Sequence, residues 1–377
     1  CGPWSRKSIL SWMNPPDCAL IPCVHVESHV PDPPRPPRLH ETEKIAMKTP
    51  ASSSSWRVAH THTPHLTPLS SPRSPPTSPM TVSAKRRRLH VPAPTKVVHC
   101  ALHGNISIEP LLASVMDTHI FQRLKNLRQL GCADHVYPTA RHSRFEHSLG
   151  VAHLAGRLCS KLKEAPMPLS AEPPSERDIL CVKLAGLCHD LGHGPYSHTF
   201  EKLVPGFKHE AMSEQLLEGL FKGSPPLVRL SHFATGDEPL DDETDFNFVA
   251  ELLRGAPPAE RTARPRSKWY LYNIVANNAF GLDVDRLDYL LRDKLCAIGG
   301  DCAFSLDTIF DNAAVRIARF DDDPEPYPVI AFSQKTAPEL WSVFRTRYDM
   351  FDKVGKGMGW RSGGMGTRMG WDGMGSG

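Results

Sequence analysis

The chain has 377 residues, 40% of them hydrophobic, and a net charge of +3, so it can bury a substantial core but is not basic enough to indicate nucleic-acid binding by charge alone. It has no run of about 18 apolar residues, which excludes a membrane-spanning helix, and no start typical of a secretory signal peptide. Its 10 cysteines form no CxxC pair, a pattern typical of reduced thiols in an intracellular protein.

Residues 1–95 are predicted to form a disordered tail. They are rich in Pro, Ser, Thr and His, and such a composition cannot bury enough apolar surface to offset chain entropy. Ser/Thr-Pro dipeptides of the tail begin at Thr63, Thr67, Ser71, Ser74 and Ser78. It ends in the basic cluster Lys85–Arg88, which is read equally well as a nuclear localisation patch and as a solvated charge run. We expect a nuclear protein, with the cytoplasm also open, and a cyclin-dependent kinase as a candidate partner of the tail.

Residues 96–353 are predicted to form a mostly α-helical domain. Apolar residues at helical spacing run from Leu111 to Leu130, where Gly131 ends the pattern, and again through "SRFEHSLGVAHLAGRLCSKL". Ser175 is a predicted N-cap of the next helix, which leads into "AGLCHDLG". Further helices are expected around 209–221, 245–253, 271–276, 283–293 and 305–319, and "YPVIAFS" is the one good strand candidate. Residues 354–377 are Gly- and Met-rich and are predicted to be a low-complexity tail, either flexible or wrongly translated.

The adjacent pair His189 and Asp190, followed by Gly-His-Gly-Pro, is the strongest chemical signal. An aspartate after an apolar helix is costly to bury without a cation or hydrogen-bond donors. A metal ion that acts as a Lewis acid needs further ligands, and His147 and Asp285 on other predicted helices can supply them. Such a mixed N/O set suits Fe, Mn, Zn or Mg. The alternative, strongest for His147 alone, is a hydrogen-bonded core histidine.

The order H…HD…D resembles the HD phosphohydrolases. The stretches "FQRLKNLRQLG", "RFEHSLGVAHLAG", "AGLCHDLGHGPYSHTFE" and "GLDVDRLDYLLRD" resemble the vertebrate dNTP triphosphohydrolases that pair a sterile alpha motif with an HD domain. The resemblance covers about residues 96–351. It implies a helical HD-domain fold and the hydrolysis of a dNTP to deoxynucleoside and inorganic triphosphate. It also implies a role in controlling dNTP pools and in antiviral restriction.

The resemblance assigns roles to residues of the site. It implies that His147, His189, Asp190 and Asp285 bind a divalent metal. It implies catalytic roles for His193, His198, His209 and Glu210, with His198 as the proton donor to the 5′ oxygen and Glu201 or Glu210 as the carboxylate that orients it. The implied substrate-binding residues are Gln129, Leu130, Arg144, Arg286, Tyr289, Asp293 and Arg347. Tyr289 and Asp293 would recognise the deoxyribose, although core packing alone would also explain Tyr289.

The resemblance also implies regulation by GTP or dGTP and a dNTP, bound between subunits of a homodimer or tetramer. The matching positions are Lys96, Val97, Asp117, Gln122, Lys125, Val136 and Tyr137. Lys125 stands where the family has Arg, and His99–Cys100–Ala101 stands where it has Asn-Asp-Pro.

The chain departs most from the family near residues 351–354. The resemblance ends there, before the family segment that closes over the nucleotide base. The first 95 residues also show no sterile alpha motif. We therefore expect a truncated chain that is weakly active or inactive and forms no stable nucleotide-linked tetramer. Two alternatives stay open. One is an HD phosphohydrolase for another nucleotide, and the other is an inactive regulator that binds single-stranded nucleic acid.

Overall fold

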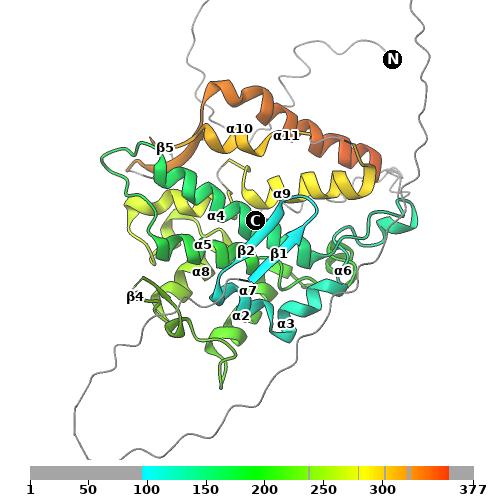
Figure 1. Ribbon diagram of the computed structural model, residues 1–377, viewed down its shortest axis with the longest axis horizontal. Coiled ribbons are helices and arrows are strands. Elements are labelled where there is room, and N and C mark those ends of the chain that lie inside the picture. The colour runs from blue at the N-terminus through cyan, green and yellow to red at the C-terminus, as the bar shows by residue number, and fades with distance from the viewer. Residues whose placement is uncertain are drawn as a thin grey trace, which may run out of the picture. The chain divides into compact units, whose positions relative to one another are not determined.

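The computed structural model describes residues 96–355 except 237, 279, 301, 302, 321, 322 and 324. The two predicted tails lie outside these residues, apart from Val354 and Gly355. The described part is mostly helical, as predicted, and its strands occur as three two-stranded antiparallel pairs (Figure 1). None of its helices combines the length and the apolar character that crossing a membrane requires.

Three helices form the centre of the domain: α4 (Arg144–Glu164), α5 (Glu176–Cys188) and α9 (Val284–Asp293). Helix α4 packs against both α5 and α9. The first two begin at capped N-termini, since the Glu146 carboxylate accepts from the Ser143 N–H at 3.0 Å and Ser175 Oγ accepts from the Asp178 N–H at 3.1 Å. The predicted Ser175 cap is therefore confirmed, and the apolar faces of all three helices enter one core.

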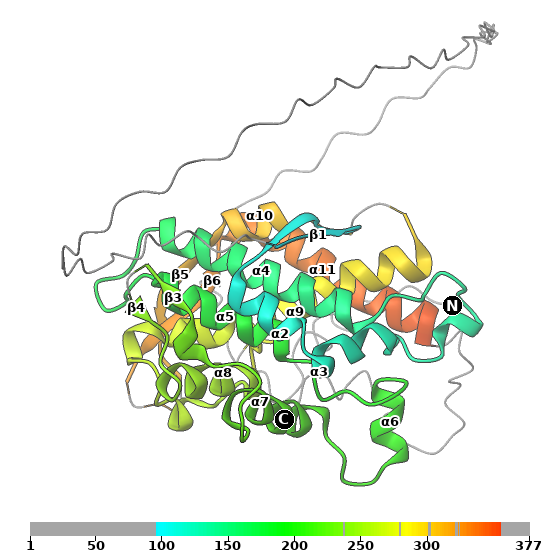
Figure 2. The same cartoon turned by 60° about the horizontal axis from the view of Figure 1, so that its bottom comes forward.

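The other helices surround this centre. They are α2 (Pro110–Met116), α3 (His119–Gln122), α6 (His198–Leu203), α7 (His209–Lys222), α8 (Thr244–Arg254), α10 (Leu306–Asp311) and α11 (Ala337–Met350). The helices predicted around 209–221, 245–253 and 283–293 are thereby confirmed as α7, α8 and α9. Figure 2 shows α6 set apart from the central helices by the loops on either side of it.

Three helical predictions are wrong in detail. The helix expected from Leu111 to Leu130 is interrupted at Thr118, whose hydroxyl caps α3, and it ends in the 3₁₀ turn Arg123–Asn126. The helix expected around 271–276 is absent: residues 271–273 end the 3₁₀ helix Arg266–Asn273, and 274–276 are not helical. The helix expected over 305–319 stops at Asp311, because the chain then pairs as strand β5 (Ala313–Ala318).

The predicted strand "YPVIAFS" is confirmed as β6 (Tyr327–Phe332), which pairs with β5. The pairs β1 (Lys96–Cys100) with β2 (Gly104–Ile108), and β3 (Ala234–Thr235) with β4 (Glu238–Pro239), were not predicted. These strands have at most five residues and their alternation is short, so their sequences carry little signal. In the turn between β1 and β2, Gly104 has a φ of 70°, which glycine adopts without strain.

A buried ion-pair network joins α5 and α8 to the 3₁₀ helix Arg266–Asn273 and to the segment just before it. Arg264 donates to Asp178 Oδ1 and to Asp245 Oδ1, both at 2.7 Å. Lys268 Nζ donates to Asp178 Oδ2 at 2.6 Å, and Arg177 Nε donates to Asp245 Oδ2 at 2.8 Å. Both carboxylates are almost completely buried, so their charge depends on these cations.

We therefore predict that Arg264→Met destabilises the domain strongly. Removing the shared cation leaves two buried carboxylates undercompensated, which costs about 3–5 kcal/mol of unfolding free energy. Urea denaturation followed by circular dichroism measures this loss. The matched control is Arg254→Met, which breaks the more exposed Arg254–Glu214 pair and should cost less than about 1 kcal/mol. Equal losses in the two variants would contradict the prediction.

Candidate functional site

The four residues predicted as metal ligands converge from three helices. His147 lies on α4, His189 and Asp190 lie at the C-terminal end of α5, and Asp285 lies in the first turn of α9. Asp285 Oδ1 is 2.9 Å from His147 Nε2 and 3.4 Å from His189 Nε2. The two Nε2 atoms are 3.2 Å apart, and each lies 3.5 Å from one oxygen of Asp190. Two nitrogens and two carboxylates thus face a common point.

The outer nitrogens of both histidines are anchored. His147 Nδ1 lies 2.8 Å from Asp288 Oδ2, and His189 Nδ1 lies 2.8 Å from the carbonyl oxygen of Gly186. When Nδ1 donates to these acceptors, Nε2 is left to act as a ligand, as in the outer-shell pairs of protein metal sites. His147, His189 and Asp190 therefore fit a divalent ion with mixed nitrogen and oxygen ligands, and Asp285 lies beside the two histidines.

Asp288 was not predicted, although it lies one helical turn after Asp285. It is fully buried and also contacts His103 Nε2 at 2.6 Å and Arg292 Nε at 2.8 Å. Burial opposes its charge, but the Arg292 charge and these hydrogen bonds hold the pKa of Asp288 well below its usual range. At Gly150 on α4 an added Cβ would lie 1.9 Å from Asp288 Oδ1, so only glycine fits there.

Arg144, the first residue of α4, faces the same site. Its Nη1 donates to Asp190 Oδ2 at 2.6 Å and its Nε donates to Ser197 Oγ at 3.0 Å. Burial opposes the charge of Asp190, but Arg144 and the neighbouring histidines hold the pKa of this carboxyl well below its usual range. The residue predicted to contact phosphate thus pairs directly with a predicted metal ligand.

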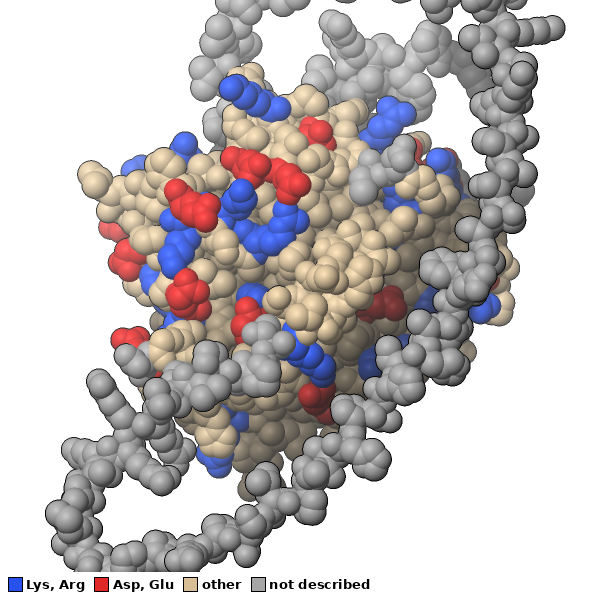
Figure 3. Space-filling model, viewed as in Figure 1, with Lys and Arg blue, Asp and Glu red and all other residues tan. Residues whose placement is uncertain are grey.

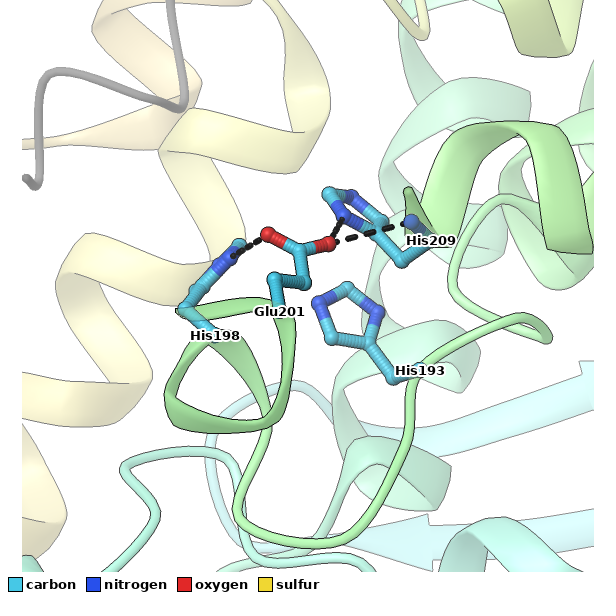
Figure 4. Close-up of side chains that lie close together, drawn as sticks. All are labelled: His193, His198, Glu201 and His209. Atoms are coloured by element: carbon cyan, nitrogen blue, oxygen red, sulfur yellow. Dashed lines mark hydrogen bonds and ion pairs between the residues drawn. The ribbon is translucent and has the colours of Figure 1, made fainter. Parts of the chain in front are cut away.

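A second cluster joins His193, His198, Glu201 and His209 (Figure 4). Glu201 accepts from the backbone N–H of His209 at 3.0 Å and also contacts His209 Nδ1, while its other oxygen lies 3.3 Å from His198 Nδ1. The rings of His193 and His209 overlap with their centroids 3.9 Å apart. His193 Nδ1 lies 3.1 Å from Asp190 Oδ1, which links this cluster to the first.

The structure distinguishes the two glutamates proposed to orient His198. Glu201 contacts both His198 and His209, whereas Glu210 is about half exposed and lies 3.3 Å from His209 Nδ1. Burial lowers the pKa of His198 and of His193 below the usual range of histidine. By contrast, hydrogen bonds to Asp285 and Asp288 raise the pKa of His147 to about 10 despite its burial. The pKa of His147 is therefore shifted in the direction opposite to the pKa values of His193 and His198.

The loop before α6 holds the second cluster in place. Tyr196 and Ser197 have φ values of 62° and 54°, which non-glycine residues rarely adopt. Ser197 Oγ donates to the Arg128 carbonyl at 2.6 Å, and Arg123 donates to the carbonyls of Leu191 and, at 2.8 Å, of His193. Neither Ser197 nor Arg123 was predicted, because their contacts are with residues distant in the sequence.

Helix α9 carries three predicted substrate residues, Arg286, Tyr289 and Asp293, all largely buried. Burial raises the pKa of Tyr289 to about 12, and Arg286 and Arg347 lie near enough to influence it. Asp293 Oδ1 lies 2.7 Å from His142 Nε2. Gln129 is buried nearby, since its backbone N–H donates to the carbonyl of His142 at 3.1 Å. Leu130 packs beside Tyr137 against a small apolar cluster.

The residues predicted to bind regulatory nucleotides take part in several separate contacts. Lys96 Nζ donates to Asp117 Oδ1 at 2.7 Å, although 20 residues separate them, and both side chains are exposed. Gln122 Nε2 donates to the Met116 carbonyl at 2.7 Å. Lys125 Nζ lies 4.8 Å from the centre of the Phe145 ring. The Tyr137 hydroxyl donates to the Lys353 carbonyl at 2.7 Å. Val97 and Val136 are exposed. The structure thus brings Lys96 and Asp117 together.

We predict that the chain binds a divalent metal and that His189→Ala or Asp190→Ala abolishes this binding while the domain still folds, because each substitution deletes one of the predicted ligands. Mass spectrometry of metal content in purified protein, with circular dichroism for folding, measures both effects. The matched control is His135→Ala, which removes an exposed histidine and should leave the metal content unchanged. Full metal retention in both site variants would contradict the assignment.

The part of the chain that matches a known family contains these same helices. A family model described as "HD domain" matches residues 144–290, which begin at the first residue of α4 and end within α9. Its match therefore contains all four predicted metal ligands and the whole second cluster.

Curated relatives cover a longer stretch. The chain is 42% identical over 213 residues to the deoxynucleoside triphosphate triphosphohydrolase SAMHD1 of Bos taurus, covering 52% of this chain and 35% of that protein. It is 41% identical over 212 residues to the Homo sapiens protein of that name, covering 52% and 33%. It is 34% identical over 275 residues to the SAMHD1 homolog of Dictyostelium discoideum, covering 70% and 47%. The chain spans between a third and a half of the length of these relatives. These findings confirm the resemblance seen in the sequence: the chain contains an HD domain, similar in sequence to the deoxynucleoside triphosphate triphosphohydrolases.

Proposed function

We propose that this chain is a metal-dependent hydrolase that converts a dNTP to the deoxynucleoside and inorganic triphosphate. One observation carries the proposal. The converging set His147, His189, Asp190 and Asp285 lies directly beside the histidine cluster, and the 3.1 Å contact between Asp190 and His193 joins them. A metal site next to titratable groups is what phosphoester hydrolysis requires.

The first cluster would hold the ion, which is Fe, Mn, Zn or Mg by its ligand chemistry. When bound, such an ion lowers the pKa of a coordinated water molecule and polarises a phosphoryl oxygen. Asp288 keeps His147 oriented, and Arg144 keeps Asp190 charged and in place. These two residues therefore act through the ligands.

The second cluster would supply the proton for the leaving group. His198 Nε2 is buried and has no hydrogen-bond partner among the described residues, while Glu201 holds its Nδ1 side. A proton carried on Nε2 could therefore pass to the 5′ oxygen of the deoxynucleoside. Glu201 stabilises the protonated imidazole, which burial alone would disfavour.

The sugar and the triphosphate would be recognised by residues of α9 and α11. Arg286 and Arg347 offer positive charge to the phosphates. Tyr289, one turn before Asp293, would fill the space that a 2′-hydroxyl requires, and Asp293 would accept from the 3′-hydroxyl. The proximity of Tyr289 to both arginines supports this grouping.

The proposal also covers regulation of the enzyme by nucleotides and the location of the protein in the cell. The exposed Lys96–Asp117 pair supports a site for GTP or dGTP, because a carboxylate can accept from guanine and a lysine can bind phosphate. A dNTP activator and a homo-oligomer belong to the same proposal. The basic cluster 85–88, outside the described residues, supports a nuclear location. A role in antiviral defence rests on the resemblance alone.

A single-stranded nucleic acid is the partner that the alternative function would require. Figure 3 shows Lys and Arg interspersed with Asp and Glu on the face in view. Such mixed charge gives that face no extended basic stripe along which a nucleic-acid backbone could bind. This observation favours the hydrolase.

We predict that the chain, loaded with Mn²⁺ and given dGTP and GTP, releases inorganic triphosphate together with deoxyguanosine. His198→Ala should lower the turnover rate by about 10²–10⁴-fold, the usual contribution of a general acid. Ion chromatography separates triphosphate from pyrophosphate and phosphate. Exposed His135→Ala serves as the control and should keep the parental rate. Release of pyrophosphate would indicate another phosphohydrolase, and the absence of any product would favour the inactive regulator.

We predict that Tyr289→Ala increases hydrolysis of GTP relative to dGTP, because it opens the space beside the 2′ carbon. Turnover of the two nucleotides under identical conditions measures the change. Tyr289→Phe is the matched control, since it keeps the ring and should keep the discrimination. Unchanged discrimination in Tyr289→Ala would leave Tyr289 as a residue of the core.

A further inference from the structure

Asp288 connects the candidate metal site to the turn between β1 and β2. His103 lies in this turn, directly before β2, and its Nε2 is 2.6 Å from Asp288 Oδ1. His147 Nδ1 is 2.8 Å from Oδ2 of the same carboxylate. The side chains of His103, Asp288 and His147 are 2%, 0% and 1% exposed. One buried carboxylate thus joins a histidine of the hairpin to a predicted metal ligand.

Both histidines present a proton to Asp288. An ionised carboxylate only accepts hydrogen bonds, so His103 donates from Nε2 and His147 donates from Nδ1. The other ring nitrogen of His147, Nε2, is left on the side of the candidate metal site, where it lies 2.9 Å from Asp285 Oδ1. The direction of this ligand nitrogen therefore depends on where Asp288 places its Oδ2.

His103 holds the carboxylate from outside the helix that carries it. Arg292 also holds it, with Nε 2.8 Å from Oδ2 and Nη2 2.9 Å from Oδ1. Because Arg292 lies one turn further along α9, its hydrogen bonds move together with Asp288 and do not fix it relative to α4. The hairpin contacts α9 a second time, where Arg292 donates to Cys100 Sγ at 3.6 Å. The hairpin is therefore anchored on α9 at two points, and one of them is the carboxylate itself.

We propose that His103 is a positioning residue for the metal ligand His147 and acts through Asp288. Its hydrogen bond to Oδ1 holds the carboxylate in the rotation that places Oδ2 against His147 Nδ1. The loss of an outer-shell partner of a metal site typically costs about 10–100-fold in metal affinity. The proposal rests on the metal site of the proposed function and extends it to a residue two hydrogen bonds away from the ligand.

Mn²⁺ binding by the purified chain tests the proposal. Isothermal titration calorimetry with Mn²⁺ alone compares the parental chain with His103→Leu, which removes the donor but keeps a side chain in the buried space. We expect the dissociation constant to rise about 10-fold. His103→Gln is the conservative variant, because its amide nitrogen can still donate to Oδ1, and it should recover most of the affinity. An unchanged dissociation constant in His103→Leu would overturn the proposal.

A matched control separates positioning from packing. The ring of His153 lies beside that of His103, with the ring centroids 5.5 Å apart, whereas Asp288 takes its hydrogen bonds from His103, His147 and Arg292. His153→Leu therefore disturbs the same packing without removing a donor to the carboxylate. Urea denaturation measures the stability of both Leu variants, and only His103→Leu should weaken Mn²⁺ binding. Equal weakening in the two variants would assign His103 to packing and contradict the proposal.

A double-mutant cycle with Asp288→Asn tests the route of the effect. If His103 acts through the carboxylate, His103→Leu should not raise the Mn²⁺ dissociation constant further once Asp288→Asn is present. Additive losses would show that His103 acts by another route and would contradict the proposal. If Asp288→Asn does not fold, the comparison of His103→Leu, His103→Gln and His153→Leu still decides.

The His147 ring provides a readout that needs no metal. In the metal-free chain with isotopically labelled histidine, the Nδ1 proton held by Asp288 should give a slowly exchanging NMR signal, which His147→Gln identifies by removing it. We expect this proton to exchange faster with solvent in His103→Leu and at the parental rate in His103→Gln. An unchanged exchange rate in His103→Leu would contradict the positioning role. A parental chain that binds no Mn²⁺ would instead contradict the proposed function, while this signal still decides the role of His103.

Discussion

The candidate site depends on the contacts of one buried carboxylate, that of Asp288. It is enclosed between α4 and α9 and is charged only because His103, His147 and Arg292 surround it. These partners come from the turn between β1 and β2, from α4 and from α9 itself, so one carboxylate ties three parts of the chain together. A carboxylate buried in this way is costly unless every oxygen is satisfied, and here both oxygens are. The absence of a side chain at Gly150 is what allows α4 to approach it.

Asp190 divides the site into two electrostatic environments. On one side, acidic partners raise the pKa of His147 and, against the effect of burial, that of His189. On the other side, burial lowers the pKa of His193 and His198. Groups of the same chemical type thus acquire different protonation behaviour within a few ångströms because their neighbours differ.

The proposed substrate residues lie at the edge of the region that the HD domain family shares. The family match ends at residue 290, within α9, whereas Asp293 and Arg347 follow it. The four predicted metal ligands therefore lie inside the family match, together with Arg144, Arg286 and Tyr289.

The sequence by itself determined the helical class and the centres of α4, α5, α7, α8 and α9, because those features are encoded locally in helical periodicity and caps. The His-Asp pair indicated the candidate metal ligands, which stay a prediction. The sequence also indicated β6 through its run of β-branched and aromatic residues. Only the tertiary structure decided that α10 ends where β5 begins, since β5 exists by pairing with β6. The same holds for Asp288, Ser197 and the pairing of Arg144 with Asp190. Their roles come from contacts with residues 46 to 185 positions away, and no local pattern carries that information.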